Sequence, residues 1–149
     1  MRKKNPSPAG RRTTRTTRAE AELIAAALGA RRRAYAPYSH FKVGAALRCA
    51  DGSIVPGCNV ENASFGATVC AERNALAAAV VLGHREFTLL AIATGSNPPA
   101  PPCGLCRQVL SEFSPRLPIL LVNEQGGLLR TRLEHLLPMG FDFFAARKR

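Results

Sequence analysis

The spacing of hydrophobic and polar positions predicts three helices. Residues 19–36 combine strong helix formers with acidic residues at the start and arginines at the end, which suits the helix dipole, and Pro37 ends this helix. Residues 71–82 are rich in alanine and apolar on nearly every side, so we expect a buried helix that stops at Gly83. A third helix is expected over residues 104–113.

Five apolar stretches predict the strands of one sheet: residues 41–48, 53–60, 87–94, 118–122 and 128–132. A turn at Asp51 and Gly52 joins the first two strands, which predicts an antiparallel hairpin. Only five residues separate the last two strands, too few for a parallel crossover, so the last strand should run antiparallel. We therefore predict an α/β fold with three layers, α/β/α, around a mixed five-stranded sheet.

Charge is concentrated at the two ends of the chain. The length of 149 residues suits one domain, but the net charge of +11 at first suggests a nucleic-acid partner. Residues 1–18 hold seven basic residues and no acid, and residues 147–149 are all basic, which leaves +1 for residues 19–146. We therefore expect a disordered basic arm (1–18), one folded domain (19–146) and a basic tail (147–149), and no binding of nucleic acid by the domain.

The five cysteines favour metal binding over disulfide bonds, because their number is odd and two of them form a C-x-x-C pair. The basic start of the chain lacks the apolar segment of a secretory signal, which indicates a reducing, cytoplasmic location. The longest apolar stretch, residues 75–82, is far shorter than the roughly 20 residues that span a bilayer. No membrane partner is expected.

Three cysteines at the starts of two expected helices predict a catalytic zinc site, and these are Cys70, Cys103 and Cys106. Three thiolates leave the fourth tetrahedral position of Zn²⁺ to water, whereas a closed structural site needs four protein ligands. Glu72 follows the first ligand by two residues, so its carboxylate can act as general acid and base beside that position. The pattern matches the zinc deaminase signature H-x-E followed by P-C-x-x-C, with Cys70 in place of the histidine.

Four segments carry a resemblance to a known family: YAPYSHFKVGAAL, GCNVENASFG, TVCAERNAL and PPCGLCRQVLSEF. With these motifs in order, residues 35–138 resemble the small homotetrameric class of cytidine deaminases. The resemblance implies that residues 19–146 form a cytidine deaminase domain. It also implies zinc-dependent hydrolysis of cytidine and deoxycytidine to uridine and deoxyuridine with release of ammonia, in pyrimidine salvage, by a homotetramer with shared active sites.

The resemblance also implies roles for single residues. Phe41 would pack on the pyrimidine ring, and Asn59 and Glu61 would bind the ribose hydroxyls. The backbone amide of Ala71 would donate to the pyrimidine carbonyl. Arg73 resembles an arginine that hydrogen-bonds the thiolates, and Arg107, next to a ligand, is a second candidate for that role. The positions that would reach or border a neighbour's active site are Ala63, Phe65 and Phe141, with Phe65 where the family often has tyrosine.

Three alternatives stay open. The substrate can be a nucleoside antibiotic such as blasticidin S, although Asn59 and Glu61 argue for a ribose. The basic arm raises the alternative of a polynucleotide editor. In such a protein the last strand is expected to be parallel, but the five-residue connection before the last strand here is too short for that arrangement. A zinc-stabilised binding module without catalysis would show no turnover of cytidine.

Overall fold

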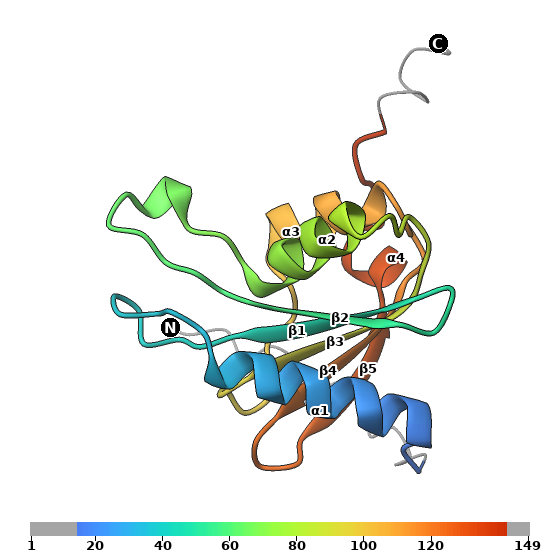
Figure 1. The fold of residues 1–149 in the computed structure, drawn as a ribbon, viewed down its shortest axis with the longest axis horizontal. Coiled ribbons are helices and arrows are strands. Elements are labelled where there is room, and N and C mark those ends of the chain that lie inside the picture. Colours follow the sequence, from blue (N-terminus) through green and yellow to red (C-terminus); the bar gives the residue numbers. More distant parts are fainter. Residues whose placement is uncertain (1–14, 143–149) are drawn as a thin grey trace, which may run out of the picture.

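A computed structural model describes residues 15–142, which form one five-stranded sheet with helices on both faces (Figure 1). In chain order the elements are α1 (Arg18–Arg32), β1 (Gly44–Cys49), β2 (Ile54–Cys58), the 3₁₀ helix η1 (Phe65–Ala67), α2 (Ala71–Val81), β3 (Phe87–Thr94), α3 (Gly104–Ser111), β4 (Pro118–Asn123), β5 (Leu128–Arg132) and α4 (Leu133–Leu136). Within this part of the chain, no helix has the length and apolar character needed to cross a membrane.

The sheet is mixed, with the strand order β2-β1-β3-β4-β5. β1 pairs antiparallel with both β2 and β3, β3 pairs parallel with β4, and β4 pairs antiparallel with β5. The predicted hairpin and the predicted direction of the last strand are therefore confirmed. The turn into β5 uses Gly126 at φ 83°, in the left-handed region that favours glycine.

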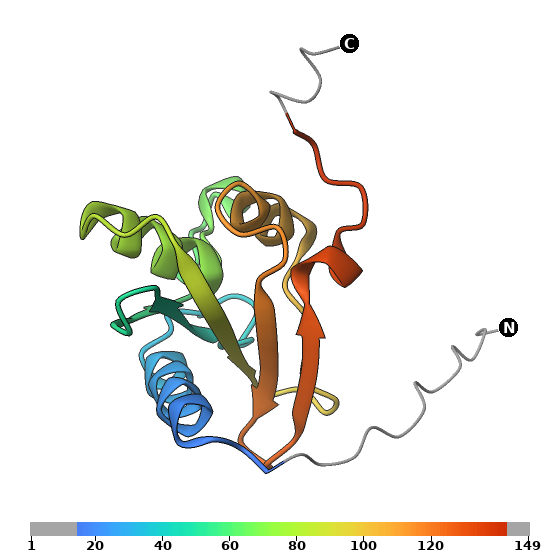
Figure 2. The ribbon, with the colours of Figure 1, turned by 90° about the vertical axis from the view of Figure 1, so that its right-hand side faces the viewer.

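The molecule has three layers, as predicted. α1 covers one face of the sheet, while α2, α3 and α4 cover the other (Figures 1 and 2). Alternate residues of one strand enter different cores, because side chains alternate across a sheet. In β1, Ala46 packs with Leu23 and Ala27 on the α1 side, whereas Leu47 packs with Ala75 and other residues on the α2 side.

One close approach fixes the position of α2 on the sheet. β2 crosses the start of this helix at Gly57, and a Cβ atom there would overlap the backbone of Ala71 and Ala75. Only glycine allows so short a separation between a strand and a helix. The first turn of α2, which begins directly after Cys70, is thereby held against the sheet.

Some element ends differ from the predictions. α1 begins at Arg18, because Thr17 caps it and forms a capping box with Glu20, and it ends at Arg32 rather than before Pro37. The C-terminal end of the predicted arm thus belongs to the folded part, while residues 1–14 and 143–149 lie outside the described residues. Two short elements, η1 and α4, were not predicted.

Candidate metal centre and active site

Three thiols converge where α2 and α3 begin. Cys70 is the N-cap of α2, Cys103 is the N-cap of α3, and Cys106 lies in the first turn of α3. The Sγ atoms of Cys70 and Cys103 lie 3.8 Å apart, and those of Cys103 and Cys106 lie 3.5 Å apart. Sulfur ligands of one tetrahedral zinc ion, each at about 2.3 Å, lie roughly 3.8 Å from one another. The predicted ligand set is therefore brought together at a spacing that fits Zn²⁺.

The pKa values of two of the thiols are shifted in opposite directions. Hydrogen bonding from Cys106, then from Cys103 and Arg73, lowers the pKa of Cys70 to about 5, although burial opposes this. The bond to Cys70 and burial raise the pKa of Cys106. One thiolate is thus already favoured at neutral pH, and a divalent cation would displace the remaining protons on binding.

Glu72 is buried beside this cluster. It lies in the first turn of α2, and only 4% of it is exposed. Burial raises the pKa of its carboxyl, and the nearby charge of Cys70 adds to the effect. An exposed acid at a helix start would show neither feature. A carboxyl with a raised pKa beside a metal site can accept and return protons near neutral pH.

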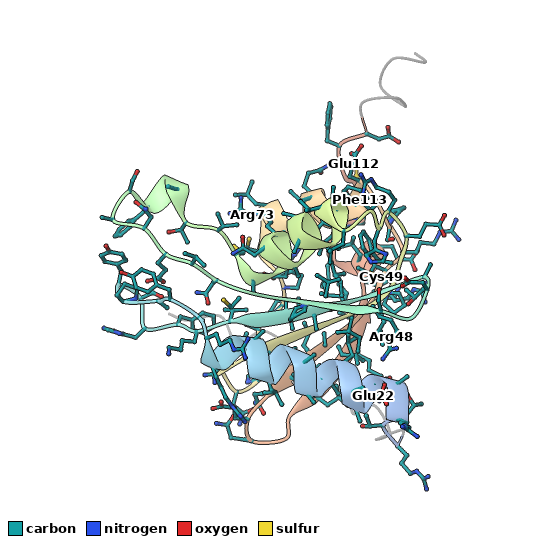
Figure 3. All side chains as sticks on the ribbon, viewed as in Figure 1. Glu22, Arg48, Cys49, Arg73, Glu112 and Phe113 are labelled. Carbon is teal, nitrogen blue, oxygen red and sulfur yellow. The ribbon has the colours of Figure 1, made fainter. Side chains whose placement is uncertain are left out.

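Arg73 lies beside Cys70, and Figure 3 shows it at the start of α2 near sulfur atoms. Its guanidinium donates from one terminal nitrogen to the carbonyl of Thr68, 2.9 Å away. Its Nε is buried and has no hydrogen-bond partner among the described residues. The guanidinium therefore has both a fixed position and a positive charge to offer the thiolates.

Arg107, the second candidate for a hydrogen bond to a ligand sulfur, bonds to two backbone carbonyls. Its Nε donates to the carbonyl of Pro102 at 2.8 Å, and a terminal nitrogen donates to the carbonyl of Leu136 at 2.9 Å. Arg107 thereby connects Pro102, the residue before Cys103, to Leu136 at the end of α4. It supports the position of that ligand through the backbone.

The predicted sugar ligands also hold the segment that carries Phe41. The carboxylate of Glu61 accepts from the amides of Tyr38 (2.9 Å) and Ser39 (3.2 Å) and from the Ser39 hydroxyl. The Ser39 hydroxyl is the main cause of the lowered pKa of Glu61. Asn59 accepts from the amide of Val43 at 2.8 Å and donates to the carbonyl of Phe41 at 2.9 Å.

These bonds explain why β1 begins at Gly44 and not at Phe41 as predicted. In residues 38–43, three backbone amides and the carbonyl of Phe41 bond to the side chains of Asn59 and Glu61. Phe41 is 43% exposed, whereas Asn59 and Glu61 are buried. The structure brings all three predicted substrate residues together in this region.

Three other predicted residues lie on the surface of this chain. Ala63 is exposed, Phe65 is 74% exposed, and Phe141 is 69% exposed. The ring of Phe65 contacts that of Tyr38 edge-on, with centroids 6.0 Å apart. Ala71, by contrast, is fully buried as the first residue of α2, where its amide has no acceptor within the helix.

Two residues with positioning contacts were missed from the sequence. Ser39 holds Glu61, and the side chain of Gln108 pairs with the backbone of Phe141 in both directions, at 2.8 Å and 3.0 Å. Both contacts join positions more than 20 residues apart. No sequence motif or regular spacing links the two partners of either contact, so neither contact could be predicted.

Comparison with known proteins agrees with this geometry. Residues 17–121 match the family described as the cytidine and deoxycytidylate deaminase zinc-binding region. A cytidine deaminase of Halalkalibacterium halodurans is 47% identical over 120 residues, which cover 80% of this chain and 91% of that protein.

Structural comparison gives the same family. A crystal structure of cytidine deaminase from Burkholderia pseudomallei is 49% identical with a TM-score of 0.79, and the match covers 81% of this chain and 98% of that one. A more distant relative, a blasticidin-S deaminase of Bacillus cereus, is 33% identical over 107 residues, covering 66% of this chain and 76% of that protein. With most of its length matched and its three thiols brought together beside a buried glutamate, the chain belongs to the cytidine and deoxycytidylate deaminase family.

Proposed function

We propose that this protein hydrolyses cytidine and deoxycytidine to uridine and deoxyuridine, with release of ammonia, and uses one catalytic zinc ion per chain. The observation that carries the proposal is the buried carboxyl of Glu72 beside three thiols at zinc-ligand spacing. The relatives named cytidine deaminase support the choice of substrate. A pyrimidine salvage role follows from that reaction.

Glu72 carries out both proton transfers. Zinc held by the three thiolates would supply Lewis-acid chemistry that makes a water molecule a nucleophile at neutral pH. Glu72 takes a proton from the attacking water and gives one to ring nitrogen 3 as the new bond to carbon 4 forms. It then takes the proton of the new hydroxyl on carbon 4 and passes it to the exocyclic amine, so the carbon–nitrogen bond breaks, ammonia leaves and the carbonyl of uridine forms. Arg73 offsets the negative charge of the ligand set.

The groups that bind the sugar still have unused hydrogen-bond donors and acceptors in this structure, and the base is bound by Phe41 and Ala71. Glu61 accepts three hydrogen bonds from Tyr38 and Ser39, and a carboxylate has about four acceptor sites, so one remains for the 3′-hydroxyl. Asn59 keeps one amide hydrogen for the ribose. Phe41 packs on the pyrimidine ring, and the amide of Ala71 donates to its carbonyl.

A homotetramer with shared active sites explains the exposed apolar side chains. Besides Phe65 and Phe141, Met139 is 92% exposed and Leu105 is 66% exposed. We propose that neighbouring copies cover these side chains and that Ala63, Phe65 and Phe141 border a neighbour's site. We also place the protein in the cytoplasm, because all five cysteines are free thiols and a thiolate zinc site needs a reducing compartment.

The activity is tested by following the loss of cytidine absorbance in the ultraviolet, with and without a chelator. We expect turnover of cytidine and deoxycytidine that a chelator abolishes and added Zn²⁺ restores. Blasticidin S is the comparison substrate, because the Bacillus cereus relative bears its name. Faster turnover of blasticidin S than of cytidine would replace the proposed substrate, and no turnover of either would contradict the proposal.

A further inference from the structure

A second group of metal-ligating side chains lies away from the thiol cluster. Cys49 ends β1, Asp51 lies in the turn between β1 and β2, and His84 follows α2. One ligand atom from each residue lies within 4.8 Å of the other two. Figure 3 shows Cys49 near the β1–β2 hairpin and Arg73 at the opposite end of α2.

The backbone brings these residues together over a long sequence separation. Gly83 has φ 93°, which turns the chain sharply after α2, and the amide of His84 donates to the carbonyl of Ala79 at 3.0 Å. His84 is thereby directed back over the hairpin turn. The turn itself is held by the amide of Gly52, which donates to the carbonyl of Cys49 at 3.0 Å.

Ser53 orients the two polar side chains. Asp51 Oδ1 accepts from the amide of Ser53 at 3.0 Å and from its hydroxyl at 2.7 Å, so Oδ2 remains free of that residue. This Oδ2 lies 3.8 Å from Nδ1 of His84, while Nε2 of His84 lies 3.4 Å from the Ser53 hydroxyl. A distance of 3.8 Å is too long for a hydrogen bond. Two ligands on one tetrahedral zinc ion lie roughly 3.3 Å apart, so a small approach would suffice.

Solvent reaches this cluster from one side. A hollow of about 290 Å³ is lined by Ala50, Asp51, Gly83, His84, Arg85 and Glu86. Cys49 is only 1% exposed and lies at the inner side of the cluster, at the edge of the core. An ion could therefore enter through the hollow and meet a thiol behind the carboxylate and the imidazole.

We propose that Cys49, Asp51 and His84 bind a second Zn²⁺ ion, with water from the hollow as the fourth ligand. One sulfur, one nitrogen and one oxygen form a donor set that suits zinc, and Ser53 supplies the hydrogen bonds that orient two of the ligands. The ion joins the β1–β2 hairpin to the end of α2. The site is independent of the deaminase reaction.

The test counts zinc in the full-length, zinc-loaded protein after equilibrium dialysis against Zn²⁺. We expect about two ions per chain, and about one in Asp51→Asn and in His84→Ala, each of which removes one ligand. His135→Ala is the matched control and should keep both ions, because His135 lies in α4, outside the cluster. Ser53→Ala should keep all three ligands but lower the affinity for the second ion about tenfold.

The sulfur ligand is tested with Co²⁺ added to protein that carries zinc in the Cys70, Cys103 and Cys106 cluster and no zinc in the second site. A thiolate-to-cobalt charge-transfer absorption should appear, disappear in Cys49→Ser, and persist in Cys58→Ser, whose sulfur lies outside the cluster. One zinc ion per chain in the unaltered protein would overturn the proposal. So would a second ion that survives both Asp51→Asn and His84→Ala. Cytidine turnover is not a readout, so a failed deaminase assay would leave this result unaffected.

Discussion

At the residue scale, the environment of each ionisable group assigns its role. Glu72 and Glu61 are both glutamates, yet burial beside a thiolate raises the pKa of Glu72, whereas the Ser39 hydroxyl and nearby amides lower that of Glu61. The first therefore suits proton transfer. The second stays ionised at neutral pH and acts as a hydrogen-bond acceptor. Two changes test these surroundings without touching the carboxylates.

Ser39→Ala removes a hydroxyl that holds Glu61. We expect kcat/KM for cytidine to fall about tenfold, equivalent to about 1.4 kcal/mol, mostly through KM, because the ribose acceptor loses its fixed position. Steady-state kinetics measure this. Ser64→Ala is the control, since Ser64 is exposed and its side chain makes no capping bond. An unchanged KM in Ser39→Ala would remove Glu61 from the sugar site.

Arg73→Gln removes the positive charge beside Cys70. Zinc should be lost to a chelator about tenfold more readily, and turnover should fall, because the ligand set loses its charge compensation. Arg73→Lys, which keeps the charge, should recover part of both properties. Zinc content after timed chelation measures the effect, and equal retention in all three proteins would show that Arg73 has no influence on the metal.

At the scale of elements, the site depends on how closely α2 lies against β2. Gly57→Ala places a methyl group into the backbone of Ala71 and Ala75, so the helix must move. We expect unfolding free energy to drop by about 1–3 kcal/mol and zinc affinity to fall. Gly29→Ala in α1 is the control, because nothing lies within 4 Å of its Cβ position. Denaturation that shows equal stability for the two variants would contradict this close approach.

The elements also show what the sequence could predict. The strand Phe87–Thr94 matched its prediction, because its apolar run lies between clear helix and turn signals. The proximity of Cys70 and Cys103 could be predicted because both cysteines stand at the start of an expected helix and both are typical zinc ligands. The region from Tyr38 to Val43 was predicted wrongly as partly strand. Its hydrogen bonds to the distant side chains of Asn59 and Glu61 cannot be seen in the local pattern of hydrophobic and polar residues.

At the scale of the whole molecule, exposed apolar side chains predict assembly. Four copies of the 16.0 kDa chain would have a mass of about 64 kDa. Phe65→Ser should weaken this assembly, because the 74% exposed ring would lose a contact with a neighbour. Analytical ultracentrifugation measures the mass of both proteins. A species of the mass of one chain at all concentrations in the unaltered protein would contradict the tetramer.

The most direct test of the proposed chemistry is Glu72→Gln, which keeps the shape of the side chain and removes its proton transfers. Zinc content and cytidine turnover are measured on the same sample, with Glu112→Gln as the control for an exposed glutamate. We predict the zinc content of the unaltered protein in both variants and a loss of turnover of at least about a thousandfold only in Glu72→Gln. A Glu72→Gln protein that keeps a tenth of the activity would contradict the role of this carboxyl as general acid and base.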